Sequence, residues 1–378
     1  SPFPVPSANM SRAYVNPLGM QLAPCTYCGY CEKYGCGNYS KASPQTTILP
    51  ALMQRRNFSL RTNSEVLSVE KTADGSRASG VTYVDTSGEV VFQPAEIVVL
   101  CAYPLQNTRL LLLSNIGTPY DPRSGEGVVG KNYCYQVMSS VTVFFEEEHT
   151  NGFVGAGALG MAVDDYNGDN FDHSGLGFIG GAYIASWTTH QRPIESHPTP
   201  EGTPGWGLEW KRAMRKNFLK HTSLSIHGAS MAHRENYLDL DPNYTDQWGR
   251  PLMRMTFDFT ENDRRLSDYI TPIAEEIARN MGGREVNVSQ FTDDNYDIKP
   301  YQTTHNTGGT IMGQTPADSV VNRYLQSWEL PNLFVMGAGV FPQNAGYNPT
   351  DTVAALTYWS AQAIRQQYLR NPGPMVQA

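Results

Sequence analysis

The pattern that most constrains this chain is a strand, turn and helix that occurs in the first third and again near the end. Residues 96–102 form an apolar run of buried-strand length, and Pro104 then opens a helical pattern over residues 105–114. Residues 332–337 make a second buried strand, and a long helix over residues 350–368 follows it. This order predicts an α/β sheet to which two distant parts of the sequence contribute.

The stretch between these parts differs in composition. It is rich in Gly, Asn, Asp, Tyr and Trp, and it includes a turn at residues 247–251 and a helical pattern over residues 263–281 that ends at two glycines. Before it, residues 80–85 and 90–92 predict a hairpin. A chain of 378 residues suffices for two or three domains or one discontinuous fold. We therefore divide it into segments 1–117, 118–295 and 296–378.

Charge and hydropathy exclude two classes of partner. Lys and Arg total 28 and Asp and Glu 36, which gives a net charge of −8 with no basic run. This balance argues against nucleic-acid binding, which depends on neutralising phosphates. No stretch reaches the roughly 18 apolar residues of a membrane-spanning helix. The Pro-rich residues 1–6 lack the basic end and apolar core of a signal peptide and predict an extended segment.

Four of the six cysteines fall within twelve residues, at positions Cys25, Cys28, Cys31 and Cys36. The spacing differs by one residue from the ferredoxin run C-x2-C-x2-C-x3-C-P and lacks its proline. Zinc sites draw cysteine pairs from more distant loops, and disulfides between such near neighbours close strained rings. We rank an iron–sulfur cluster first, zinc second and disulfides third.

Two stretches near the end carry candidate catalytic groups. In the first, His305 precedes a glycine pair, beside which a ligand can approach the backbone closely. A lone histidine is more often a structural residue. In the second, Asn348 and Pro349 precede Thr350 and Asp351, which open the last helix. The start of a helix favours an anion, and a reduced flavin is one.

Together these two stretches resemble the glucose–methanol–choline (GMC) oxidoreductases, FAD enzymes that oxidise alcohols. Residues 63–66, 98–114 and 235–242 resemble further landmarks of that family, and the resemblance covers nearly all of residues 25–370. The cysteine cluster and residues 160–173 narrow it to the branch that includes membrane-associated gluconate 2-dehydrogenase. The fold that this implies is α/β plus α+β: part of a discontinuous, Rossmann-like FAD-binding domain, with a substrate domain built on an antiparallel sheet.

The resemblance also implies roles for single residues. His305 is the expected general base for the substrate hydroxyl, and Asn348 the expected hydrogen-bond partner of the same oxygen. The expected flavin contacts are Val66, Ala102, Gly337, Ala338, Pro349 and Thr350. The family commonly has Asp followed by Ala-Ser where this chain has Gly337, Ala338 and Gly339, so we expect backbone contacts there. His173, Trp187 and Gln343 are candidate pocket residues on loop grounds, with ordinary loop packing as the alternative.

One family landmark is not found. Members begin with a strand and G-x-G-x-x-G, which hold the FAD pyrophosphate. The string at residues 155–160 matches that expression but follows no buried strand and opens no helix, so it predicts a loop. Residues 164–172 resemble a calcium loop in composition, but the glycine is misplaced. The sequence therefore looks like the carboxy-terminal two thirds of an enzyme, with the fingerprint on another chain or on a segment outside this sequence.

The resemblance implies a dehydrogenase of a sugar or sugar acid such as gluconate. Hydride would pass to FAD, and electrons would pass through an iron–sulfur cluster, 3Fe–4S in preference to 4Fe–4S, to a cytochrome c-type subunit. It further implies a small companion subunit and a periplasmic location at the inner membrane. Two alternatives stay open: a non-catalytic iron–sulfur electron-transfer or binding protein, and an oxygen-using alcohol oxidase. For Cys101 and Cys134 we expect only buried packing.

Overall fold

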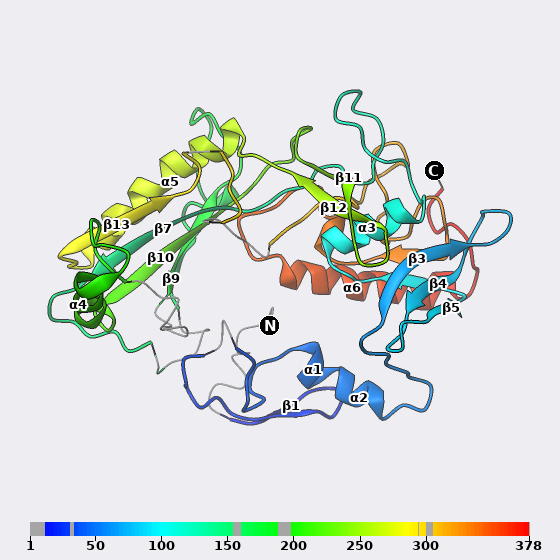
Figure 1. The fold of residues 1–378 in the computed structure, drawn as a ribbon, viewed down its shortest axis with the longest axis horizontal. Helices are drawn as coiled ribbons and strands as arrows, with labels where there is room; N and C mark the ends of the chain where they lie inside the picture. Colours follow the sequence, from blue (N-terminus) through cyan, green and yellow to red (C-terminus); the bar gives the residue numbers. More distant parts are fainter. Residues whose placement is uncertain are drawn as a thin grey trace.

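The computed structural model describes residues 12–30, 34–152, 154, 160–187, 198–293, 295–299 and 305–377. Figure 1 shows a large sheet with a long helix across it, a mixed region of short sheets and helices, and an amino-terminal segment that lies apart from both. The predicted fold class, α/β with an antiparallel substrate domain, is confirmed by these regions.

The large sheet has five antiparallel strands in the order β13-β7-β10-β9-β8. Their bounds are β7 (Val137–Phe144), β8 (Ala162–Val163), β9 (Ala182–Trp187), β10 (His221–Gly228) and β13 (Glu285–Gln290). Side chains of β7 alternate between buried and half-buried, as in a strand that is covered on one face.

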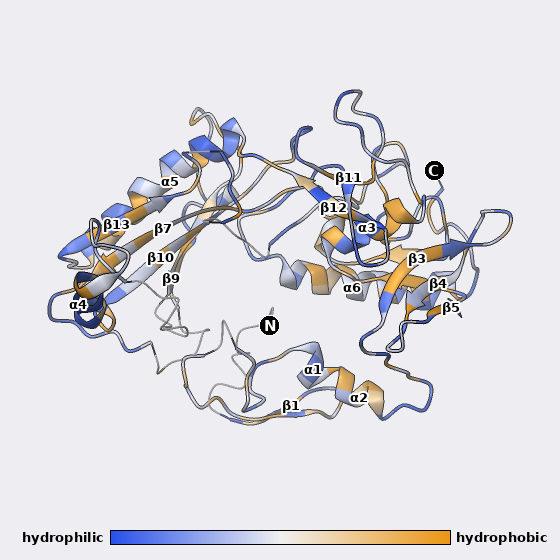
Figure 2. Ribbon diagram, viewed as in Figure 1, coloured by the Kyte–Doolittle hydropathy of each residue, from blue (hydrophilic) through white to orange (hydrophobic). Residues whose placement is uncertain are grey.

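Helix α5 (Glu261–Asn280) covers that sheet and buries Ile270, Ala274 and Ala278 against it. The helix starts with a reciprocal capping box between Thr260 and Asp263. Figure 2 shows that most of α5 is hydrophilic, because only a narrow stripe faces the sheet.

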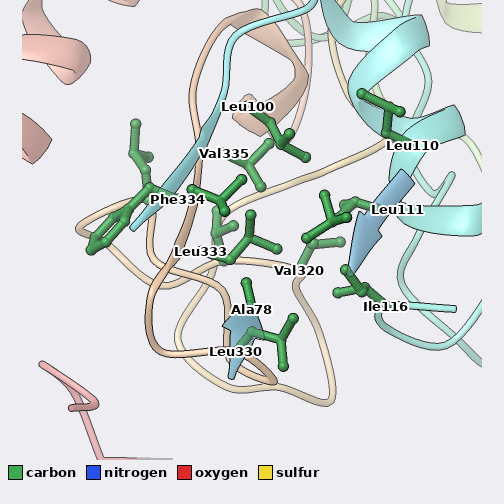
Figure 3. Packing of buried hydrophobic residues seen from close by; sticks show 14 of the residues in the cluster. Ala78, Leu100, Leu110, Leu111, Ile116, Val320, Leu330, Leu333, Phe334 and Val335 are labelled. Carbon is green, nitrogen blue, oxygen red and sulfur yellow. The ribbon is translucent and has the colours of Figure 1, made fainter. Parts of the chain in front are cut away.

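The mixed region contains the predicted α/β unit. Strand β6 (Val98–Leu100) lies parallel to β14 (Leu333–Val335), and α3 (Pro104–Leu113) follows β6 with Pro104 in its first turn. The two segments pair although more than two hundred residues separate them. Figure 3 shows their packing, in which Leu100, Leu111 and Phe334 share one apolar core.

Two antiparallel units flank this core. One is the sheet of β3 (Glu65–Lys71), β4 (Ala78–Val84) and β5 (Val90–Pro94), which confirms the predicted hairpin. The other is the hairpin of β11 (Tyr237–Thr245) and β12 (Pro251–Thr256), which packs against α3. A buried ion pair between Arg109 of α3 and Asp246, 2.5 Å apart, fixes this contact.

Helix α6 (Thr350–Ala363) runs beneath the mixed region and continues as a π-helical turn (Ile364–Tyr368). Its N-cap is Pro349, and no side chain caps it, so the expected Thr and Asp capping is wrong. The preceding proline sets the start instead, because its fixed φ suits the first turn. Helix α4 (Gly207–Asn217) lies at the far end of the large sheet.

The amino-terminal segment contains β1 (Tyr14–Val15), β2 (Gln21–Leu22), α1 (Pro44–Thr47) and α2 (Leu49–Met53). These elements contact one another, and the cysteine loop lies between β2 and α1. Within the parts of the chain that the structure describes, no helix is both long and apolar enough to cross a membrane.

A substitution at Gly308 tests whether the backbone close to His305 is as tightly packed as the structure shows. At its φ of +82°, a Cβ atom would lie 1.9 Å from the carbonyl oxygen of Asn132. We expect Gly308→Ala to lower the free energy of unfolding by about 3 kcal/mol or more, measured by urea denaturation. Gly249→Ala is the control, because its φ is +71° but nothing lies within 4 Å of the new Cβ, so only about 1 kcal/mol of backbone strain is added. Equal losses would contradict the clash.

Candidate active site

Two histidines and one glutamine form the centre of the site. Nδ1 of His305 lies 2.5 Å from Oε1 of Gln136, and Nδ1 of His227 lies 3.1 Å from the same oxygen. The two imidazole rings are 6.0 Å apart between centroids. Gln136 is fully buried and His227 is 5% exposed, whereas His305 is half-buried. The predicted base therefore stands at the accessible side of a buried polar cluster.

The large sheet positions the buried half of this cluster. His227 on β10 pairs in register with Tyr183 on β9, and cross-strand partners lie on the same face. Their rings stack at 4.9 Å between centroids, and Tyr347 stacks on the other side of Tyr183 at 4.6 Å. Gln136 comes directly before β7, which pairs with β10 on the edge away from β9.

Asn348 joins the site through this stack. The hydroxyl of Tyr183 donates to Oδ1 of Asn348 over 2.9 Å. The loop before α6 is held further by Asn344, whose side chain donates to the carbonyl oxygen of His305 and whose backbone forms two bonds with Ser230. The structure thus brings both predicted catalytic residues to one site: His305 lies beside His227, and Asn348 is bonded to Tyr183, which stacks on His227.

Burial sets the protonation of the histidines. It lowers the pKa of His227 to about 3, with a further contribution from His305, and it lowers the pKa of His305 below its usual value. Both imidazoles are therefore neutral near pH 7. A neutral imidazole has one unprotonated nitrogen, which a general base requires.

The buried His227 makes stability depend on pH. Below its ordinary pKa of 6.5, the unfolded chain binds a proton that the folded chain excludes down to about pH 3. This group therefore removes stability as the pH falls, by up to about 1.4 kcal/mol per pH unit. We expect His227→Gln to lose less stability than the wild type between pH 7 and pH 5 in urea denaturation. The exposed His149→Gln should match the wild type, and an unchanged slope for His227→Gln would contradict the assignment.

Three of the six expected flavin contacts lie at the carboxyl ends of the parallel strands. Ala102 follows β6 and is exposed, and Gly337 and Ala338 follow β14. In parallel sheets this edge is where ligands bind. Gly337 has a φ of +110°, and nothing lies within 4 Å of the position of a Cβ atom there. This open backbone fits the close approach of a dinucleotide.

Tyr103 and the other three expected contacts are also fully or partly accessible. Tyr103, 43% exposed and with a φ of +77°, receives a hydrogen bond from Asn306, the residue after His305. Pro349 and Thr350 are half-buried at the start of α6, and Val66 on β3 is 40% exposed. The exposed apolar groups and the helix start suit a planar ring with a partial negative charge, so the residues present fit FAD.

The cysteine loop gives a mixed result. Cys25, Cys28 and Cys36 are thiols outside any disulfide, while Cys31 lies outside the described residues. Burial raises the pKa of Cys36, but backbone N–H groups of Lys41, Ser40 and Asn38 outweigh it and lower that pKa overall. This chemistry fits a thiolate ligand. However, no three His, Cys, Asp or Glu side chains of the described ranges are gathered as a metal site requires.

The other cysteines and the loop candidates have different surroundings. Cys134 is buried, as expected, whereas Cys101 is exposed at the end of β6, so the expectation of burial is wrong there. His173 stacks on Phe178 beside an open cavity of about 620 Å³ that His305 does not line. Trp187 ends strand β9 and is not a loop residue. Gln343 is exposed in the loop before α6.

Sequence reasoning missed Gln136, His227 and Tyr183. They lie in or beside strands, where alternation places them on the face toward His305, but no motif marks them. A polar residue at an inward strand position was the available signal. Its meaning depends on the register of β7, β9 and β10, which the sequence does not show.

The chain belongs to the GMC oxidoreductases. One model of that family matches residues 9–138 and a second matches residues 232–357, which include His305 and Asn348. The chain is 51% identical over its full length to the gluconate 2-dehydrogenase flavoprotein of Pantoea cypripedii, of which it spans 62%. It is 30% identical to 2-methyl-1,2-propanediol dehydrogenase of Mycolicibacterium austroafricanum, over 89% of this chain and 59% of that protein.

Solved structures agree on the fold. Pyridoxine 4-oxidase from Mesorbium loti superimposes with a TM-score of 0.58 at 16% identity, over 97% of this chain and 72% of that one. A formate oxidase variant from Aspergillus oryzae gives 0.55 at 15% identity, over 81% of this chain and 60% of that one. At these identities the likeness concerns the fold alone.

Proposed function

We propose that this chain is the larger part of an FAD-dependent dehydrogenase that oxidises a hydroxyl group of a sugar acid such as gluconate. The observation that carries the proposal is the cluster of His305, His227 and Gln136, with Asn348 held beside it. The likeness to the gluconate 2-dehydrogenase flavoprotein supports the substrate class.

In this mechanism the protein supplies proton transfer and positioning. Gln136 accepts hydrogen from Nδ1 of His305, so Nε2 is the nitrogen that takes the substrate hydroxyl proton. Asn348, oriented by Tyr183, donates a hydrogen bond to the same substrate oxygen through its NH2 group, because its Oδ1 already accepts from Tyr183. FAD, when bound, supplies the hydride acceptor. The residues expected to hold it are Val66, Ala102, Gly337, Ala338, Pro349 and Thr350.

We propose further that Cys25, Cys28, Cys31 and Cys36 bind an iron–sulfur cluster, with 3Fe–4S favoured. The support is their spacing and the amide groups that favour a thiolate at Cys36. Among the described residues no such group of side chains is gathered, and Cys31 lies outside them. We assign no catalytic step to the cluster.

The proposal includes partners. A cytochrome c-type subunit would accept the electrons, and a small companion subunit would complete a periplasmic enzyme at the inner membrane. The likeness to the gluconate 2-dehydrogenase flavoprotein supports an enzyme of several subunits. The chain spans 62% of that relative and 59% of the second one.

An absorption spectrum of the enzyme with its partners tests the proposal. We expect flavin bands that gluconate bleaches under anaerobic conditions, and reoxidation by a c-type cytochrome. Bleaching that is reversed by oxygen with formation of peroxide would identify an alcohol oxidase instead. An iron–sulfur shoulder without flavin bands would identify a non-catalytic electron-transfer protein. Glycerol at the same concentration is the control for non-specific reduction.

A further inference from the structure

We propose that Gln136 is a positioning residue that holds His305 and His227 in the tautomer with hydrogen on Nδ1. It thereby keeps Nε2 of His305 unprotonated and in a fixed orientation. The inference deepens the proposed function, because it rests on the role of His305 as the base. It concerns a residue that no sequence motif marks.

The side chain of Gln136 is fixed by three contacts. Its oxygen faces Nδ1 of both histidines, at 2.5 Å and 3.1 Å. Its NH2 group donates to the carbonyl oxygen of Gly346 over 2.7 Å. Gln136 itself has zero exposure, so water does not compete for its amide group. Gln136 therefore connects the His305 segment, β10 and the loop that carries Asn348.

The direction of the amide follows from Gly346. A carbonyl oxygen only accepts hydrogen bonds, so the NH2 group of Gln136 must face it and the amide oxygen must face the imidazoles. The amide oxygen likewise only accepts, so each Nδ1 must carry the hydrogen. A flipped amide would place two oxygens 2.7 Å apart with no hydrogen between them. The tautomer of both histidines is thus set by one backbone carbonyl, through one side chain.

An amide suits this position better than a carboxylate. Among the described residues, the titratable groups whose rings contact the two imidazoles are each other and Tyr183 from β9; Tyr347 stacks on the far side of Tyr183, with Asp164 beyond it. A carboxylate at position 136 would stabilise the imidazolium form and protonate the base. Gln136 instead orients the rings without adding charge.

The experiment compares Gln136→Met and Gln136→Glu with the wild-type holoenzyme. Gln136→Met keeps the volume but removes the acceptor. Gln136→Glu keeps an acceptor but adds charge. In ¹⁵N-histidine NMR spectra we expect two wild-type rings with hydrogen on Nδ1 only, and a mixture of tautomers in Gln136→Met. We expect gluconate to reduce the flavin of Gln136→Met at least about 10-fold more slowly than that of the wild type, because the base is no longer held in one orientation.

The pH profile gives a second readout. In Gln136→Glu the acid limb of flavin reduction should move to higher pH by at least about one unit, because the carboxylate favours the protonated base. Gln93→Glu, the same change on β5 outside the site, should leave the profile unchanged. Wild-type tautomers in Gln136→Met, or a wild-type profile in Gln136→Glu, would overturn the inference. If gluconate fails to reduce the wild type, the proposed function fails, while the NMR spectra still decide the role of Gln136.

Discussion

His305→Ala should leave FAD bound but slow its reduction by substrate about 10²–10⁴-fold, the usual contribution of a general base. The imidazole is half-buried, its Nδ1 is held by Gln136, and burial keeps it neutral. Its removal leaves no equivalent acceptor at the accessible side of the cluster, because His227 is 5% exposed. Anaerobic stopped-flow spectroscopy of the flavin bands measures the rate.

Two comparisons separate base catalysis from general damage. His149→Ala, on an exposed loop outside the site, should reduce at the wild-type rate. Added imidazole should restore part of the rate in His305→Ala, because the missing group is a proton acceptor. Reduction of His305→Ala at the wild-type rate would remove this residue from the mechanism.

Cys36→Ser should leave flavin reduction by substrate unchanged and abolish electron delivery to the cytochrome acceptor. Three backbone N–H groups favour a thiolate at Cys36, and a serine hydroxyl is a poor ligand for an iron–sulfur cluster. Iron and acid-labile sulfide per flavin should fall in the same variant. Single-turnover flavin reduction and steady-state cytochrome reduction measure the two steps separately.

The control is Cys101→Ser, which should keep the wild-type content of iron and sulfide because Cys101 lies outside the cysteine loop. The same pair of measurements on Cys31→Ser extends the test to the cysteine outside the described residues. If Cys36→Ser still delivers electrons while it lacks iron, the loop has a structural role and the cluster proposal is wrong.

Local patterns predicted several elements well. The hairpin of β4 and β5, the strand β6 followed by α3, and the helix α5 with its end before the glycine pair are confirmed. Each depends on residues that are close in the sequence: turn residues, a proline in the first turn, or an amphipathic period. The start of α6 at Thr350 is confirmed, but the expected capping by Thr and Asp is wrong, because Pro349 is the N-cap.

The residues of the site likewise divide into those that a local motif marks and those that only strand register brings together. His305 and Asn348 could be selected from sequence because each lies in a short motif with glycine or proline beside it. Gln136, His227 and Tyr183 could not, because their meeting depends on strand register. A shift of one residue in β10 would turn His227 to the opposite face of the sheet.

The sequence by itself determined the family, the α/β elements at both ends and two residues of the candidate site, His305 and Asn348, because these are encoded in contiguous segments. Only the tertiary structure decided that β6 and β14 are parallel neighbours and that one buried amide connects two histidines from distant segments. The physical reason is that hydrogen bonds and burial act over a few ångströms in space, and folding brings together residues that are far apart in the chain.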